Sequence, residues 1–171
     1  MNIVLCGMMG AGKTEIGKRL SFITGRERLD TDELIIERFG AIEEIFSRFG
    51  ERDFREKEEK IIAEISQKGG MVISTGGGAF LREKNVENLQ KNGKIVYLRA
   101  KKETLLERLS LDKSRPLLKG EKNLESKLER LLLERTPIYE RVSDFILDVD
   151  GYSAKENTER VILLLQGAGL I

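Results

Sequence analysis

The sequence predicts an α/β fold of three layers, in which helices cover both faces of a central five-stranded parallel sheet. Two observations support this. Short apolar runs alternate with longer segments whose apolar spacing is helical, and such alternation favours parallel strands joined by right-handed crossovers. The length of 171 residues suits one domain, spanning 1–171. We expect the five strands at 3–6, within 26–32, and at 71–74, 94–98 and 145–147.

The first strand leads through a glycine-rich loop into a helix. Residues 7–14 read GMMGAGKT, which fits the phosphate-loop pattern of a glycine, four residues and Gly-Lys-Ser/Thr. Glycines let main-chain N–H groups reach a polyphosphate, and the helix that starts near Lys13 adds the positive end of its dipole. Lys13 supplies a cation for the terminal phosphates, and the Thr14 hydroxyl is placed to ligate Mg²⁺. The loop predicts nucleotide binding, the alternative being a chance glycine-rich turn.

The second expected strand has a composition that disfavours strands. It carries two aspartates, Asp30 and Asp32, before a helix that starts near residue 34. In an extended segment this spacing places both carboxylates on one face. At a strand's carboxyl end, that face looks into the crevice where open α/β sheets bind ligands. One carboxylate then serves a metal and the other a substrate hydroxyl. The simpler alternative is that Asp32 caps the following helix.

Two helices separated near Gly50 are expected over 41–68, the second of them rich in charge. From its charge pattern alone, Arg55 is a solvated or paired side chain like its neighbours.

The third strand runs into Thr75 and the triple glycine 76–78. Glycines at the end of a buried strand let another molecule approach the backbone closely, although a plain flexible turn is the alternative. No aspartate follows this strand, so the usual second magnesium-binding carboxylate of phosphate-loop enzymes is missing there. Asp30 is therefore the stronger candidate for a carboxylate that helps to bind Mg²⁺.

The second half of the chain contains a polar segment, 110–123, that suits a mobile lid. Its Arg115 is placed to close over a transferring phosphoryl group, the alternative being a surface loop without function. Pro137 is expected to kink or interrupt the helix around it. We expect helices over 81–91, 102–109, 124–141 and 154–166.

The composition excludes several classes of function. The chain has no histidine, so a Ser-His-Asp triad, a histidine-bound zinc and a histidine general base are all excluded. The formal net charge of +1 provides no overall attraction to nucleic acid or to a membrane. The apolar runs are too short to span a bilayer and the N-terminus lacks a secretory signal, so we expect a cytoplasmic protein. The single Cys6 reads as a small buried hydrophobe.

Taken together, the motifs resemble those of the shikimate kinases, within the nucleoside-monophosphate-kinase-like group of phosphate-loop folds. The resemblance covers essentially the whole chain and implies transfer of the γ-phosphoryl group of ATP to the 3-hydroxyl of shikimate, with Mg²⁺, on the route to aromatic amino acids. We expect a monomer that binds ATP and shikimate. The motifs stand in order at 7–14, 29–32, 50–51 with 54–55, 74–78, 115–118, and 135 with 137 and 139.

The resemblance also implies roles for individual residues. Asp32 would orient or deprotonate the acceptor, Arg55 and Arg135 would grip the substrate carboxylate, and Arg108 would stack on adenine. Planar guanidinium groups suit a carboxylate because they bind it through paired, charge-assisted hydrogen bonds. The implied catalytic residues are Lys13, Asp32 and Arg115. The implied ATP-binding residues are Gly10, Ala11, Gly12, Lys13, Thr14, Glu15, Arg108 and Arg115. The implied substrate-binding residues are Asp32, Arg55, Gly76, Gly77, Gly78 and Arg135, and the helices expected to bind the substrate lie at about 31–68. The implied metal ligands are Thr14 and Asp30.

The chain departs from this family after the last strand. The family commonly places an arginine and a proline there against the adenine, whereas residues 148–153 read DVDGYS. Main-chain contacts from this loop are the expected replacement.

Two other functions fit the same residues: a kinase for another hydroxy acid such as gluconate, and an ATP-binding regulatory module without an acceptor.

Overall fold

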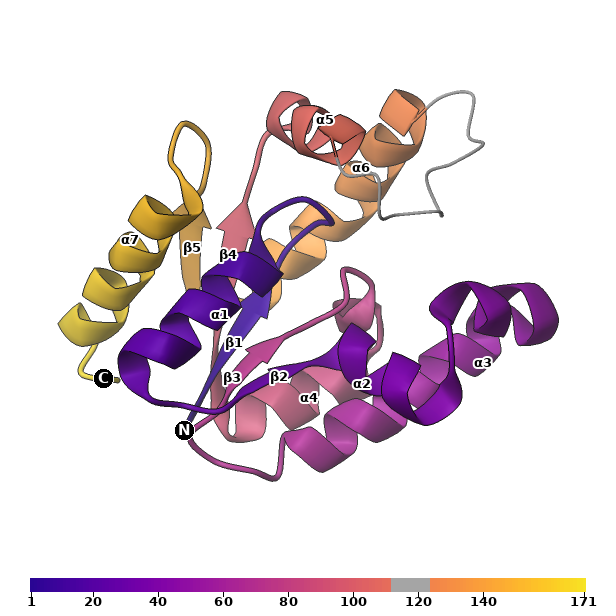
Figure 1. The fold of residues 1–171 in the computed structure, drawn as a ribbon, viewed down its shortest axis with the longest axis horizontal. Helices are drawn as coiled ribbons and strands as arrows, with labels where there is room; N and C mark the ends of the chain where they lie inside the picture. The colour runs from indigo at the N-terminus through magenta and orange to yellow at the C-terminus, as the bar shows by residue number, and fades with distance from the viewer. Residues whose placement is uncertain (112–123) are drawn as a thin grey trace.

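The structure, a computed structural model, describes residues 1–111 and 124–171. Five strands form one parallel sheet in the order β2-β3-β1-β4-β5 (Figure 1). The expected five-stranded parallel sheet is therefore confirmed, although the second strand is shorter than the segment that predicted it. The strands are β1 Asn2–Cys6, β2 Arg28–Asp30, β3 Val72–Ser74, β4 Gly93–Arg99 and β5 Phe145–Asp148.

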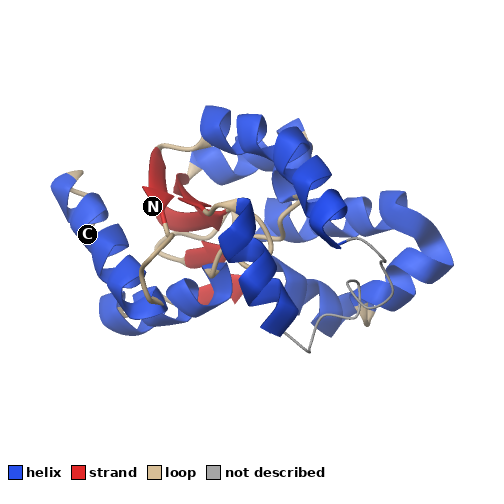
Figure 2. Cartoon of the chain, turned by 90° about the horizontal axis from the view of Figure 1, so that it is seen from above, coloured by secondary structure: helices blue, strands red, loops and turns tan. Residues whose placement is uncertain are grey.

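Helices cover both faces of the sheet (Figure 2). α1 packs beside α7 on one face, while α3 packs beside α4 on the other, where α6 also contacts β4 (Figure 1). The three-layer architecture is confirmed. The helices are α1 Lys13–Thr24, α2 Thr31–Phe39, α3 Ile42–Ile65, α4 Glu83–Lys91, α5 Lys102–Leu111, α6 Leu124–Val142 and α7 Ala154–Gly167, with a short 3₁₀ turn, η1, at Ala79–Leu81.

The central strand β1 is buried along its whole length, as is usual for a parallel strand covered on both faces. Cys6 ends this strand fully buried, and burial raises the pKa of its thiol to about 12, so it is a structural residue. Since all strands run the same way, their carboxyl ends meet at one edge of the sheet. The glycine-rich loop, Asp30 and the triple glycine all follow strands at that edge.

Two helix expectations have different outcomes. α3 contains a non-helical residue, Gly50, with φ 79° and ψ 175°, which divides it as the sequence predicts. α6, in contrast, runs through Pro137 as one helix, so of the expected kink or interruption the interruption is wrong. Proline removes one hydrogen bond, to the carbonyl of Leu133, and Leu133 is 76% exposed, so water reaches this turn.

None of the helices within the described ranges combines the length and apolar character needed to cross a membrane.

Candidate active site

The glycine-rich loop wraps around the amino end of α1. Gly7, Gly10 and Gly12 have φ of 141°, 82° and 96°, a region that side chains disfavour. Gly12 is the N-cap of α1, and no side chain in the described part of the chain caps that end, so its N–H groups face outward as an anion site. The Lys13 ammonium lies across the loop, where Nζ donates to the carbonyl oxygens of Gly7 (2.7 Å) and Met8 (2.9 Å).

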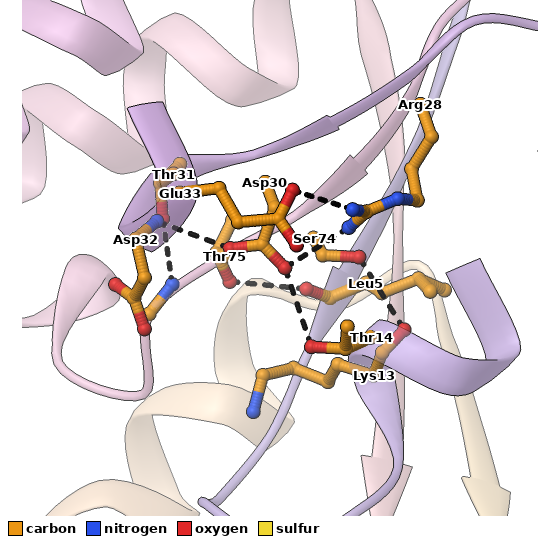
Figure 3. Close-up of polar contacts among 11 residues, drawn as sticks. Leu5, Lys13, Thr14, Arg28, Asp30, Thr31, Asp32, Glu33, Ser74 and Thr75 are labelled. Carbon is orange, nitrogen blue, oxygen red and sulfur yellow. Dashed lines mark hydrogen bonds and ion pairs between the residues drawn. The ribbon is translucent and has the colours of Figure 1, made fainter. Parts of the chain in front are cut away.

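Asp30 connects this loop to the neighbouring strand. In Figure 3 its carboxylate lies between the Thr14 hydroxyl and the Arg28 guanidinium, each of which donates to Oδ2 at 3.2 Å. Its other oxygen accepts from the main-chain N–H of Asp32 at 3.1 Å. Asp30 is only 8% exposed. The Thr14 hydroxyl and the Asp30 carboxylate therefore offer two oxygen ligands for a metal ion beside the glycine-rich loop.

The expectation that both aspartates lie in one extended segment is wrong. β2 ends at Asp30, which is the N-cap of α2, and Asp32 lies in the first helical turn. The alternative that Asp32 is the cap is wrong as well. Thr31 fixes this turn, since its Oγ1 accepts from the N–H of Gly76 at 2.8 Å.

Two cavities open along this edge of the sheet and share Met9, Asp32 and Gly77. The smaller, of about 240 Å³, lies over the glycine-rich loop and is also lined by Lys13, Thr14 and Asp30. The larger, of about 500 Å³, is lined by Arg55, Glu58 and Arg135 together with the triple glycine. The sequence-predicted phosphate and acid sites thus open onto one crevice, with Asp32 at their boundary.

Arg55 is fixed at the larger cavity by two acidic residues of its own helix. Its Nη1 donates to Glu58 Oε2 at 2.7 Å and its Nη2 to Glu51 Oε1 at 3.2 Å. The guanidinium also lies 5.1 Å from the centre of the Phe54 ring. The side chain is 12% exposed and paired with Glu51 and Glu58, so of the solvated or paired role that its charge pattern suggested, the paired one is confirmed.

Glu58 is a site residue that the sequence analysis missed. It is fully buried, and burial raises the pKa of its carboxyl, an effect that Arg55 beside it opposes. Its Oε1 has no hydrogen-bond partner among the described residues. The missed signal is periodicity: Glu58 falls at helical spacing with the buried Phe54, Ile61 and Ile65, which puts a charge on the apolar face of α3.

The triple glycine faces three different side chains of the cavity. A Cβ would lie 2.7 Å from Asp32 Oδ1 at Gly76, 3.2 Å from Arg135 Nη1 at Gly77 and 2.2 Å from Arg55 Nη2 at Gly78. None of the three has a positive φ. The alternative of a plain flexible turn is therefore not supported, since these positions need glycine for space and not for backbone freedom.

Arg135 reaches the same cavity from α6. It is 9% exposed, and its buried Nε has no hydrogen-bond partner within the described ranges. One turn further along α6, the Tyr139 hydroxyl donates to the carbonyl oxygen of Gly77, and burial raises the pKa of that hydroxyl. This contact fixes α6 against the triple glycine and so places Arg135 beside it.

The remaining predicted residues lie around the smaller cavity. Glu15 lines it but is exposed and paired with Arg19 at 2.9 Å. Arg108 of α5 also lines it, and its Nη1 donates to Gly10 O at 3.1 Å. Arg115 lies outside the described residues, as does the lid segment, except that Ser110 and Leu111 continue α5.

The residues at the site fit a magnesium ion better than a metal whose ligands all come from the protein. No group of three or more His, Cys, Asp or Glu able to hold a metal occurs within 1–111 and 124–171. Mg²⁺ commonly takes one or two protein oxygens and fills its octahedron with phosphate oxygens and water. Thr14 and Asp30 match that requirement.

Comparison with known proteins identifies the family. The shikimate kinase family model matches residues 9–166. The chain belongs to the shikimate kinase family. A shikimate kinase from Actinobacillus succinogenes is 45% identical over 96% of this chain and 94% of its own length, and one from Thermodesulfovibrio yellowstonii is 44% identical over 94% and 92%. A solved structure described as shikimate kinase from Acinetobacter baumannii in complex with shikimate aligns with a TM-score of 0.92 and 38% identity, covering 99% of this chain and 95% of that one. Shikimate kinases are ATP-dependent phosphotransferases, so the predicted family, fold and enzyme class are confirmed.

Proposed function

We propose that the protein is a shikimate kinase that converts ATP and shikimate into ADP and shikimate 3-phosphate. The observation that carries the proposal is the shared crevice, in which the polyphosphate loop and the cavity lined by Arg55 and Arg135 meet at Asp32. The Acinetobacter baumannii relative, described with shikimate, supports shikimate as the acid. The proposal includes a cytoplasmic monomer, and light scattering tests its oligomeric state.

At the phosphate end, the N–H groups of residues 10–15 would bind the ATP phosphates, and the Lys13 ammonium would exchange its loop carbonyl oxygens for the β- and γ-phosphate oxygens. Thr14 and Asp30, the latter through water, would hold Mg²⁺, which neutralises charge on the phosphates. Glu15 and Arg108 line the same cavity and complete the nucleotide contacts in this proposal.

At the acceptor end, Arg55 and Arg135 would bind the shikimate carboxylate. Both guanidinium groups are mostly buried beside the triple glycine, where charge-assisted hydrogen bonds are strong. Asp32 would accept a hydrogen bond from the 3-hydroxyl. As the hydroxyl oxygen bonds to the γ-phosphorus and the bond from that phosphorus to the ADP oxygen breaks, the Asp32 carboxylate would take the proton. Arg115, outside the described residues, keeps its proposed role as the lid arginine that contacts the transferring phosphoryl group.

An ADP-release assay with ATP and Mg²⁺ tests this function. We expect rapid release with shikimate, little with gluconate at the same concentration, and almost none without an acid. Faster turnover on gluconate would assign the protein to another hydroxy acid. ATP binding with no phosphorylation of either acid would favour the regulatory module.

A further inference from the structure

Arg28 lies beside the carboxylate that is the candidate metal ligand. Arg28 and Asp30 are two residues apart on β2, so their side chains lie on the same face of the sheet. In Figure 3 the Arg28 guanidinium faces the carboxylates of Asp30 and Glu33. Its Nη1 donates to Asp30 Oδ2 at 3.2 Å and its Nη2 to Glu33 Oε2 at 2.5 Å. Arg28 does not itself line the smaller cavity, so it would act on a metal there through Asp30.

We propose that Arg28, acting through Asp30, weakens the binding of a free divalent cation at Thr14 and Asp30, so that the metal binds well only together with nucleotide phosphates. The inference rests on the proposed function, since it takes Thr14 and Asp30 as the magnesium ligands. Arg28 itself precedes the motif at 29–32 and has no role in that motif.

The Arg28 side chain is held in one place between β2 and α1. It is 15% exposed, whereas its partner Glu33 is 56% exposed. Its Cδ lies 3.7 Å from the position that a Cβ would take at Gly17 of α1, so its aliphatic part packs against that helix. The guanidinium is therefore a fixed positive charge beside Asp30, at a depth where salt screens charges less than at the surface.

The orientation of the Asp30 carboxylate does not depend on Arg28. Its Oδ1 accepts from the N–H of Asp32, because Asp30 is the N-cap of α2. Its Oδ2 accepts from the Thr14 hydroxyl as well as from Arg28. The bonds from Asp32 and Thr14 fix both oxygens without the guanidinium. What Arg28 adds is a positive charge next to the oxygen that lies beside the Thr14 hydroxyl.

This charge opposes a metal ion in two ways. The guanidinium repels a dication, and its hydrogen bond competes for the Asp30 oxygen. Arg28 also offsets the negative charge of Asp30 and Glu33, which would otherwise attract the ion. Mg²⁺ bound by one or two protein oxygens takes its other ligands from phosphate and water. With its carboxylate offset by Arg28, the site therefore depends on nucleotide phosphates to bind the metal well.

Titration of the nucleotide-free full chain with Mn²⁺, followed by the electron paramagnetic resonance signal of the free ion, tests this role. Mn²⁺ is a suitable probe because it prefers the same oxygen ligands as Mg²⁺. For Arg28→Met we expect Mn²⁺ to bind roughly tenfold more tightly than in wild type, the scale of a change next to a metal ligand. Arg28→Lys keeps the charge and should stay within about twofold of wild type. Arg38→Met is the matched control and should bind Mn²⁺ as wild type does, because Arg38 also pairs with a carboxylate, that of Glu64, but at an exposed site.

Two double variants trace the route of the effect. Adding Asp30→Asn to Arg28→Met should remove the gain in Mn²⁺ affinity, because the Asp30 carboxylate is the group that Arg28 offsets. Adding Glu33→Gln should leave most of the gain. If it removes the gain, the released Glu33 carboxylate is what binds the ion, and the route through Asp30 is overturned. A thermal melt checks that each variant folds, and Arg28→Gln replaces Arg28→Met if the latter does not.

Unchanged or weaker Mn²⁺ binding in the folded, uncharged variant would overturn the inference, as would a gain that survives Asp30→Asn. The titration uses neither ATP nor shikimate, so its result is independent of the activity assay. Phosphorylation of shikimate without a gain in Mn²⁺ affinity would leave the proposed function standing and remove the role of Arg28. A gain in Mn²⁺ affinity without phosphorylation would do the reverse.

Discussion

At the scale of single residues, Asp32 lies at the boundary between the smaller cavity over the glycine-rich loop (the phosphate cavity) and the larger cavity at the triple glycine (the acid cavity). Arg135 lines the acid cavity alone. These positions predict different defects. Asp32→Asn should retain ATP affinity and lower kcat by roughly two to four orders of magnitude, because it removes the proposed acceptor of the hydroxyl proton. Arg135→Ala should chiefly raise KM for shikimate, because it removes one of the two guanidinium groups proposed to bind the substrate carboxylate. Steady-state kinetics with both substrates varied separate the two outcomes.

Glu37→Gln, exposed on the same helix as Asp32, and Arg141→Ala, exposed on the same helix as Arg135, are the matched controls and should behave as wild type. An equal loss of ATP binding in Asp32→Asn and Arg135→Ala would contradict the assigned roles.

Glu58 gives a prediction about stability and pH. Its folded-state pKa is raised above the ordinary 4.5, with burial as the main cause. The folded protein therefore binds the Glu58 proton more tightly than the unfolded chain, so this group's contribution to stability is present below pH 4.5 and is lost as pH rises through the folded pKa. Glu58→Gln removes that loss. A Gln amide also suits the site, because it offers an N–H group toward Asp32 in place of a second negative charge.

We expect the melting temperature of Glu58→Gln to exceed that of wild type at pH 8 and to match it at pH 4. Thermal denaturation of the two proteins across this range, without ligands, measures the difference. Arg55, Asp32 and Arg135 are present in both proteins, so the two proteins differ only in the group at position 58. A difference that shrinks as pH rises would show that the Glu58 carboxylate is stabilised in the fold.

At the scale of elements, the segment after β3 places Gly76, Gly77 and Gly78 against Asp32, Arg135 and Arg55 of the acid cavity. Gly78→Ala would place a methyl group 2.2 Å from the Arg55 guanidinium, the far end of a side chain that moves more easily than backbone. The fold should survive, and Arg55 should shift from its bonds to Glu58 and Glu51. We expect KM for shikimate to rise at least about tenfold, comparable to losing a charged hydrogen bond, with ATP affinity unchanged.

Initial-rate kinetics and a thermal melt check this prediction. Gly69→Ala is the matched control, because its Cβ would meet only Asn92 Nδ2, at an ordinary 3.7 Å. A normal KM in Gly78→Ala would mean that Arg55 does not need its observed position.

The same elements show what local sequence patterns predict and what they do not. The pattern of residues 7–14 fixes a strand, loop and helix because its glycines and its lysine have few other uses in that order. The turn between Asp30 and Asp32 was predicted wrongly, since whether the strand ends at one or the other depends on the Thr31–Gly76 bond to a segment 45 residues away. The interruption of the helix expected at Pro137 was wrong for a similar reason, because the packing of α6 against the sheet and η1 outweighs one lost hydrogen bond.

At the scale of the whole molecule, parallel pairing explains why the site was largely predictable. Every strand ends at the same edge, so residues placed after strands had to gather there without any knowledge of distances. Glu58 and Arg135 were harder to place, because they enter from helices and their burial depends on packing between elements. Glu58 lies in a run of charged residues that are mostly solvated, so its charge does not mark it as buried. Its helical spacing from the apolar residues of α3 is the sequence feature that distinguishes it from its charged neighbours.

The division of the crevice into two cavities predicts how the molecule responds to metal removal. Thr14 and Asp30 line only the phosphate cavity, while Arg55 and Arg135 line only the acid cavity. Excess EDTA should therefore abolish turnover and sharply reduce the melting-temperature increase caused by ADP. It should leave the increase caused by shikimate unchanged, since a ligand that binds the folded state raises stability by about RT ln(1 + [L]/Kd) wherever its own contacts remain intact. Differential scanning fluorimetry with each ligand, with and without EDTA, measures both shifts, and added Mg²⁺ should restore the first. A shikimate shift that disappears with the metal would show that the acid cavity depends on the metal site and would contradict the separation of the two.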